Sequence, residues 1–246
     1  MIGRAYQPRG HSRAYVDETK QQARSFIVSC WRGFSGQSSI PGQYVTLCGP
    51  LADHGVLRED AELRQLEAEG LYKPSQFVGV NYDDDLQVAN SRAVAAHYAP
   101  SDRPLLLTGD IIDVLHDLHS QRRLDASIIY LDTTSLLHAA APLLWQTLNI
   151  LNCFSGPRLV AWNMISGRHV PQNVVYPWDR QDGDTLSGRI AGYTGEHLRS
   201  LPGFNEAYRH GWELFRSCRY ESPKTQMTTY VFARNRKACA DACRCP

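Results

Sequence analysis

The sequence predicts an α/β protein: a doubly wound, mostly parallel sheet that ends in an antiparallel hairpin. Short apolar runs alternate with amphipathic helical patterns from residue 44 to residue 164. Such an alternation is typical of parallel strands joined by crossover helices. Near the C-terminal end, two strand-like runs, 212–220 and 225–234, flank the Pro-containing turn 221–224. Two such runs joined by a short turn indicate a hairpin.

Five short runs rich in Val, Ile, Leu and aromatic residues are the expected parallel strands, because strands buried on both faces show no polar alternation. They are Tyr44–Cys48, Gln76–Asn81, Leu105–Thr108, Ser127–Asp132 and Arg158–Met164. Helical patterns occupy Asp17–Phe34, Glu59–Glu69, Leu86–Tyr98, Ile111–Arg122 and Pro142–Cys153. Gly70 marks the end of the second helix, and Pro142 suits the first turn of the last.

The composition is that of a globular protein. Of 246 residues, 43% are hydrophobic and 21% charged, values that allow one good core. No apolar run is long enough to span a membrane, and the first residues lack the apolar segment of a secretion signal. Seven cysteines, an odd number, fit reduced thiols better than a disulfide framework. We therefore expect a cytoplasmic protein that does not contact a membrane.

The net charge of +1 hides basic ends on an acidic body. Residues 1–36 hold six Lys/Arg and two Asp/Glu, and residues 209–246 hold eight Lys/Arg and three Asp/Glu. The residues between them hold 12 Lys/Arg and 20 Asp/Glu. The basic ends either attract phosphates or are solvated tails without a partner. We divide the chain into a basic arm with an amphipathic helix at 1–43, an α/β domain at 44–235 and a Cys-rich tail at 236–246.

Polar residues follow several predicted strands, in the segments FVGVNYDDDLQVANSRAVAA, LLLTGDIIDVL and ASIIYLDTTS, before the closing segment ELFRSCRYESPKTQMTTYVFARN. In this order, the segments resemble the class I (Rossmann-like) S-adenosylmethionine-dependent methyltransferases over roughly residues 44–235. The resemblance implies a seven-stranded sheet with an inserted antiparallel last strand, and S-adenosylmethionine as the cofactor. In open α/β sheets, ligands bind outside the carboxyl ends of the strands.

The resemblance assigns the cofactor to three strand ends. The matching residues are Cys48, Gly49 and Pro50 for the methionine part, Asn81, Tyr82 and Asp83 for the ribose, and Gly109, Asp110 and Ile111 for the adenine. Asn81 stands where the family has an acidic residue, and the first turn is extended instead of Gly-x-Gly-rich. Interpretations without a ligand remain open: Gly49-Pro50 would then form an ordinary turn, and Asp83 and Asp110 would only cap the helices that follow.

The fourth strand ends at Asp132, which matches the acidic end of the family's fourth strand; with Asn163 near the end of the fifth strand, we expect it to line the methyl-transfer site. Asp132 would orient a nucleophile or bond the methionine amino group. Methyltransferases that act on exocyclic amines of nucleic-acid bases have Asp/Asn-Pro-Pro-aromatic here, whereas this chain has Asp132-Thr-Thr-Ser. That departure argues against methylation of a base amine by the same arrangement.

Residues 165–208 lack a regular pattern and mix aromatic residues with arginines: Tyr176, Trp178, Tyr193, Arg168, Arg180 and Arg189. Such pairs stack on bases, so we interpret this region as a substrate-recognition insertion and RNA or DNA as the possible acceptor. An ordinary lid or interface has the same composition. Cys239, Cys243 and Cys245 lack the usual C-x2-C spacing, so we expect no metal site.

Two other functions stay open. The irregular first turn, Asn81 and the missing Pro-Pro motif favour a catalytically silent methyltransferase-like protein that acts as a binding or partner subunit. A nucleotide-binding oxidoreductase is disfavoured because the sequence lacks Gly-x-Gly-x-x-Gly. The chain also lacks a phosphate-binding Gly-x-x-x-x-Gly-Lys-Ser/Thr loop and a Gly-x-Ser-x-Gly nucleophile motif.

Overall fold

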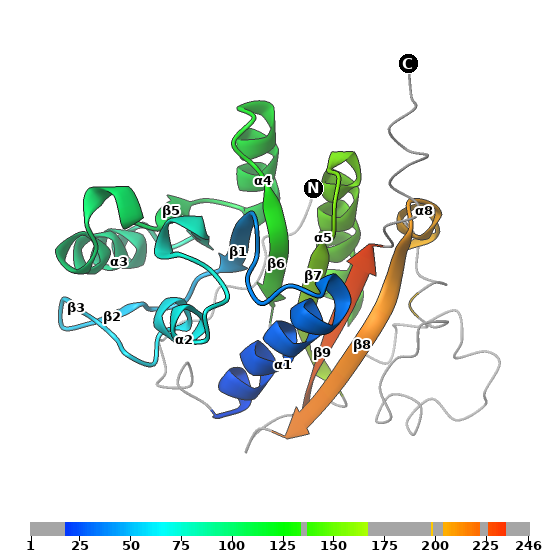
Figure 1. The fold of residues 1–246 in the computed structure, drawn as a ribbon, viewed down its shortest axis with the longest axis horizontal. Helices are drawn as coiled ribbons and strands as arrows, with labels where there is room; N and C mark the ends of the chain where they lie inside the picture. Colours follow the sequence, from blue (N-terminus) through cyan, green and yellow to red (C-terminus); the bar gives the residue numbers. More distant parts are fainter. Residues whose placement is uncertain (1–17, 134–136, 167–197, 199–203, 222–225, 235–246) are drawn as a thin grey trace.

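A computed structural model describes residues 18–133, 137–166, 198, 204–221 and 226–234. The main strands are β1 (Gln43–Leu47), β4 (Phe77–Asn81), β5 (Leu105–Thr108), β6 (Ala126–Asp132), β7 (Leu159–Ser166), β8 (Trp212–Glu221) and β9 (Gln226–Arg234). They form one seven-stranded sheet in the order β5-β4-β1-β6-β7-β9-β8 (Figure 1). All five predicted parallel strands are therefore present.

The last strand is inserted into the sheet. β1, β4, β5, β6 and β7 pair in parallel. β9 runs antiparallel both to β7 and to β8 and lies between them. This is the arrangement implied by the resemblance to class I methyltransferases, so the predicted fold class and the closing hairpin are confirmed.

Helices cover both faces of the sheet. One face carries α1 (Glu18–Ser35), α2 (Glu62–Ala68) and α3 (Asp84–His97), and the other carries α4 (Ile111–Ser120), α5 (Leu137–Ile150) and α8 (Phe204–Arg209). Alternate residues of β1 face opposite layers: Tyr44 packs in the core with Trp31 of α1, while Val45 packs with Leu115 of α4. A strand buried on both sides has no polar face, which explains the apolar runs in the sequence.

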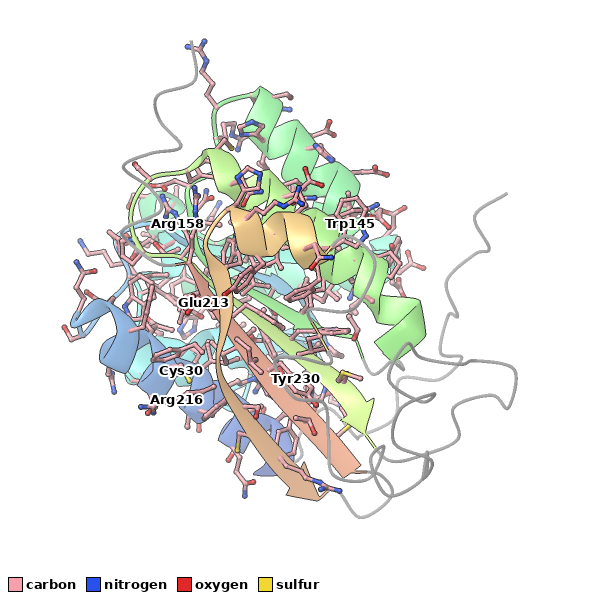
Figure 2. All side chains as sticks on the ribbon, turned by 90° about the vertical axis from the view of Figure 1, so that its right-hand side faces the viewer. Cys30, Trp145, Arg158, Glu213, Arg216 and Tyr230 are labelled. Atoms are coloured by element: carbon pink, nitrogen blue, oxygen red, sulfur yellow. The ribbon has the colours of Figure 1, made fainter. Side chains whose placement is uncertain are left out.

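Helix α1, which the sequence placed in the N-terminal arm, packs directly on the sheet. Ile27 and Trp31 are fully buried, and the Trp31 indole N–H donates to the Ser39 carbonyl oxygen at 3.2 Å. Figure 2 shows β8 at the edge of the sheet with α1 on one side and α8 on the other. The exposed side chains of Glu213 and Arg216 place charge along this edge, which discourages pairing with another strand.

Most predicted ends lie within a few residues of the observed ones, but one is wrong. Pro142 lies inside α5, which begins at Leu137. The alanine-rich turn before Pro142 favours a helix and extends it upstream, although Pro142 has no N–H to donate. The sequence also gave no sign of α8 or of the short antiparallel pair β2 (Ala52–Asp53) and β3 (Val56–Leu57).

Several predicted segments lie wholly or mostly outside the described residues: the arm before residue 18, the insertion at 165–208 and the tail at 236–246. None of the helices in the described ranges is long and apolar enough to cross a membrane.

Candidate functional site

The turn after β1 is long and is held by a buried side chain of α3. Residues 48–61 separate β1 from α2 and contain β2 and β3. Asn90 is fully buried; its carboxamide oxygen accepts from the Leu51 N–H at 2.8 Å, and its Nδ2 donates to the Gly49 carbonyl at 3.1 Å. The turn therefore has a fixed course, set by a residue forty positions further along the chain.

Cys48 contributes packing and backbone to this turn. Its side chain is buried, and burial raises the pKa of the thiol far above its ordinary value, so the thiol stays neutral. Sγ donates to the Gly49 carbonyl at 3.2 Å. Gly79 of β4 leaves room for it, since a Cβ there would lie 2.9 Å from the Cys48 Cβ.

Asn81, at the end of β4, bridges the first two strand ends. Its Nδ2 donates to the Cys48 carbonyl, and its Oδ1 accepts from the Asp83 N–H at 2.8 Å. Asp83 in turn accepts from the Leu86 N–H at 3.0 Å and caps α3. The capping prediction for this acidic run is therefore confirmed, and Asn81 shapes the turn through bonds to backbone.

Asp110, at the end of β5, caps α4 and meets Tyr82. One carboxylate oxygen accepts from the Ile112 N–H at 2.7 Å, and the other accepts from the Tyr82 hydroxyl. The Gly109 N–H donates to the Asn81 carbonyl at 2.9 Å, which joins the two strand ends. Tyr82 remains 53% exposed, whereas Ile111, the first residue of α4, is buried in the core.

Asp132, at the end of β6, is almost enclosed and paired. Lys20 of α1 donates to Oδ2 at 2.6 Å, and Asn163 of β7 donates to Oδ1 at 2.8 Å. Burial by itself would raise the pKa of Asp132, but the Lys20 ammonium and the Asn163 hydrogen bond outweigh it and hold the pKa below its ordinary value. Asp132 is therefore an ionised carboxylate at neutral pH.

Asn163 links Asp132 to the inserted hairpin. It is 1% exposed, and its Oδ1 accepts from the Tyr220 hydroxyl of β8 at 2.5 Å and from Thr229 of β9 at 3.3 Å. Tyr220 and Thr229 also share a hydrogen bond of 3.0 Å. The structure thus brings the two predicted catalytic residues together, with Asn163 orienting the carboxylate from below.

A small cleft of about 20 Å³ with charges of both signs lies beside Asp132, between α1, the β1 turn and α2. We call it the charged cleft; it is lined by Lys20, Arg24, Leu47, Gly49, Pro50, Leu51, Arg58, Asp60, Ala61, Glu62 and Asp132. Glu62 accepts from the Tyr44 hydroxyl at 2.7 Å and lies 3.7 Å from Arg24. Burial raises the pKa of Glu62 above its ordinary value, although Arg24 and Tyr44 act in the opposite direction.

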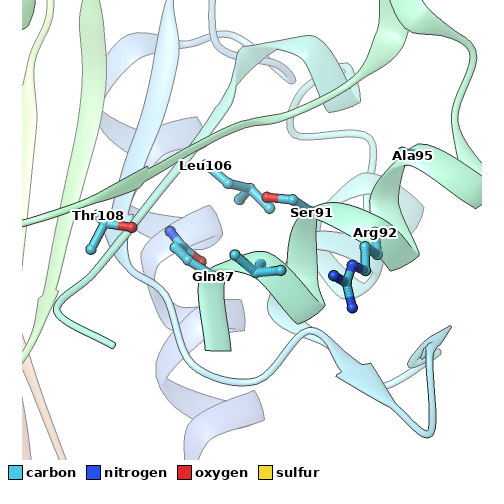
Figure 3. Close-up of a pocket in the computed structure, with 7 residues that line it drawn as sticks. Gln87, Ser91, Arg92, Ala95, Leu106 and Thr108 are labelled. Carbon is cyan, nitrogen blue, oxygen red and sulfur yellow. The ribbon is translucent and has the colours of Figure 1, made fainter. Parts of the chain in front are cut away.

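A larger hollow of about 340 Å³ lies between α3 and β5 (Figure 3). Its lining is Gln87, Val88, Ser91, Arg92, Ala95, Leu106 and Thr108. Only one of these side chains is charged, and Gln87 is used to bond the Gly79 and Leu107 carbonyls at 2.9 and 2.8 Å. We place the candidate site at the strand ends because the ionisable groups converge there.

Lys20, Arg24, Glu62, Asn90 and Tyr220 were not predicted as site residues. One sequence signal existed for the first two, since Lys20 and Arg24 lie one helical turn apart on the polar face of the N-terminal helix. Glu62, Asn90 and Tyr220 sit in ordinary helix and strand patterns, and only their contacts across the fold bring them to the site.

Comparison with known proteins found neither a matching family model nor a matching curated protein. Among solved structures, the chain is similar to magnesium protoporphyrin IX methyltransferase (ChlM) from Synechocystis PCC 6803, at 10% identity over 94% of this chain and 90% of that one, with a TM-score of 0.49. It is also similar to an O-methyltransferase from Bacillus cereus, at 13% identity over 92% and 83%, with a TM-score of 0.47. It is similar as well to TrmN from Thermus thermophilus, at 13% identity over 87% of this chain and 48% of that one, with a TM-score of 0.46.

Proposed function

We propose that this protein is an S-adenosylmethionine-dependent methyltransferase that binds its cofactor along the carboxyl ends of β1, β4, β5 and β6. One observation carries the proposal: Asn81, Asp110, Asp132 and the charged cleft all lie at this edge of a sheet with the methyltransferase strand order. That edge, at the switch in strand order beside β1, is where open α/β sheets bind ligands.

The side chains present fit an adenosine group. Asp110 uses one acceptor site per oxygen for its two bonds, so lone pairs remain for the amino group of an adenine. Asn81 keeps one N–H and one lone pair for a ribose hydroxyl. Gly49 has no side chain to block a ligand against the β1 turn, and it lines the charged cleft.

When bound, the cofactor supplies a methyl group on a positively charged sulfur. The chain contributes orientation, because transfer to a nitrogen or oxygen requires an in-line approach. Asp132 is ionised and is fixed by Lys20 and Asn163. With its remaining lone pairs it accepts a hydrogen bond from the acceptor group and sets the direction of that group.

We further propose a nucleic-acid acceptor. The support is the charge distribution: both ends of the chain are basic, and such segments attract phosphates. An RNA or DNA acceptor predicts binding that weakens steeply with salt concentration. Incubation of the protein with labelled cofactor and either RNA or DNA, at low and high salt, tests this choice.

Calorimetric titration with S-adenosylhomocysteine tests the cofactor proposal. We expect micromolar binding by the wild type and a loss of about tenfold or more in Asp110→Ala, because a hydrogen bond to a charged group is removed. Asp110→Asn keeps an acceptor for the helix cap and separates capping from ligand binding. Asp113→Asn, on the exposed side of the same helical turn, is the matched control and should bind as the wild type does. No binding by the wild type would refute the proposal.

A catalytically silent binding protein is the second candidate. The observation that favours it is the Lys20–Asp132 ion pair, in which the ammonium balances the charge of the carboxylate nearest the proposed transfer site. A silent protein either does not bind S-adenosylhomocysteine or binds it without methyl transfer to RNA, DNA or small-molecule fractions, whereas an enzyme gives labelled product in at least one fraction. The same two assays therefore distinguish the candidates.

A further inference from the structure

We propose that Arg24 and Glu62, which join α1 to α2 in the charged cleft, form a site for a zwitterionic amino-acid head: a carboxylate and an ammonium on one carbon. This inference rests on the proposed function, because it assigns that head to the methionine part of the cofactor. It departs from the turn-based assignment, since both residues come from helices and neither belongs to the segment 48–50.

Arg24 is buried, but not all of its guanidinium N–H groups have a hydrogen-bond partner. The residue is 8% exposed, its Nη1 donates to Gln65 at 3.2 Å, and its Nη2 lies 3.7 Å from the Glu62 carboxylate. Its Nε is buried and has no hydrogen-bond partner among the described residues. A buried N–H of a cation without an acceptor is costly, so a ligand carboxylate placed here recovers free energy.

Two more unpartnered polar atoms lie on the strands below. The Thr46 and Tyr130 hydroxyls are buried and lack partners within the described part of the chain. Thr46 of β1 is directly opposite Tyr130 of β6 in the sheet register, and Tyr130 lies close enough to interact electrostatically with Arg24 and Glu62. Unsatisfied groups gathered around one ion pair indicate a place built for polar atoms that a ligand or ordered water supplies.

The charges select the ligand class. Of the other cations in the cleft, Lys20 is bonded to Asp132 at 2.6 Å, and Arg58 is bonded to Asp60 at 2.9 Å. The Arg24–Glu62 pair is looser, at 3.7 Å, and is beyond hydrogen-bond distance. It therefore offers a cation for a carboxylate and an anion for an ammonium at one place, which suits a zwitterion better than an inorganic anion.

The test compares two ligands with the same thioadenosine: one has the aminocarboxypropyl group that carries this head, and the other has a methyl group in its place. S-adenosylhomocysteine carries the amino-acid head, whereas 5′-methylthioadenosine has the same adenosine and sulfur without it. Both are titrated into the wild type, Arg24→Met, Arg24→Lys and the double variant Arg24→Met/Glu62→Gln. Arg32→Met is the matched control, because Arg32 also ties α1 to α2, through the Glu69 carbonyl at 2.7 Å, but does not line the cleft.

We expect Arg24→Met to bind S-adenosylhomocysteine about tenfold or more weakly and 5′-methylthioadenosine within about twofold of the wild type. Arg24→Lys should recover part of the loss. The double variant removes both charges, so it keeps the test valid if Arg24→Met folds poorly. Arg32→Met should bind both ligands normally.

Three results would overturn the inference. If the wild type binds both ligands equally, the proposed adenosine site is supported, but the proposed site for the amino-acid head is wrong. Equal weakening of both ligands in Arg24→Met and in the double variant would mean that Arg24 only supports the fold. If the wild type binds neither ligand, the proposed function and this inference fall together.

Discussion

The polar side chains along the carboxyl edge of the sheet fall into two groups that are bonded in different ways. At the outer strands β4 and β5, Asn81 bonds the Asp83 N–H, and Asp110 bonds the Ile112 N–H, each two residues away. At the inner strands β6 and β7, Asp132 bonds Lys20 across 112 positions, and Asn163 bonds Tyr220 across 57. Each outer side chain thus has one local bond beside one to a more distant residue, whereas the inner bonds exist only in the assembled fold.

The difference has an energetic consequence. A helix cap at the surface is worth about 1 kcal/mol. Removal of one partner of a buried ion pair costs several times as much stability, because the remaining charge is stabilised neither by its partner nor by water. Substitutions at the inner strand ends should therefore affect stability more than substitutions at the outer ones.

The largest effect is expected for Asp132→Ala, which removes a nearly enclosed carboxylate that accepts hydrogen bonds from Lys20 and Asn163. We expect a loss of about 3–5 kcal/mol in the free energy of unfolding, measured by urea denaturation. Glu67→Ala breaks a half-buried ion pair with Arg64 and a hydrogen bond from the Tyr98 hydroxyl, and should cost less, about 1–2 kcal/mol. The double variant Lys20→Met/Asp132→Ala should lose less than the sum of the single losses; strict additivity would mean that the two groups are not coupled.

The same carboxylate predicts a pH dependence. Because the pKa of Asp132 is lowered in the folded state, its contribution is fully present above its unfolded value of about 4 and is lost as the pH falls through the folded value. The stability difference between the wild type and Asp132→Asn should therefore shrink in acid.

Glu62 acts with the opposite sign, since its pKa is raised: its contribution to stability is present at low pH and is lost as the pH rises through the folded value. Urea midpoints over a pH series check this, and a difference that stays constant in acid contradicts it.

A middle-sized effect is expected at Gly79 of β4, among the outer strands. A Cβ at Gly79 would lie 2.9 Å from both the Cys48 Cβ and the Leu106 Cδ2. Gly79→Ala should cost about 1–3 kcal/mol, because the core there is already filled. Gly33→Ala is the control: Gly33 lies exposed in α1 with nothing within 4 Å of an added Cβ, so the change should stabilise the protein by up to about 1 kcal/mol. Equal effects of the two substitutions would argue against tight packing at Gly79.

The smallest effect on stability is expected for Tyr82→Phe. The hydroxyl that bonds Asp110 belongs to a side chain that is largely exposed, so the free energy of unfolding should change by about 0.5 kcal/mol or less. The sharper readout is affinity: without the hydroxyl, the adenine amino group no longer shares an Asp110 oxygen with Tyr82, and S-adenosylhomocysteine should bind a few-fold more tightly. Weaker binding by this variant would show that Tyr82 contacts the ligand through its hydroxyl.

Much of the outer group was predictable from sequence. Strands buried on both faces show as apolar runs, and an Asp directly before a helical pattern is a cap signal, as at Asp83 and Asp110. The predicted start of α5 at Pro142 was wrong, because the preference of proline for a first turn was given more weight than the helix-favouring alanines before it. Asp132 and Asn163 were found as strand-end residues, but nothing in the sequence indicated Lys20 or Tyr220 as their partners.

The sequence by itself determined the order of strands and helices, the closing hairpin and the local bonds at the helix starts, because these depend on side-chain periodicity and on neighbours a few residues apart. The tertiary structure alone decided which charge faces which. Lys20 reaches Asp132, and Arg24 reaches Glu62, only because α1 packs across the sheet and carries both cations to the strand ends. Burial then strengthens the interactions between these charges, and a one-dimensional pattern records neither the burial nor the pairing.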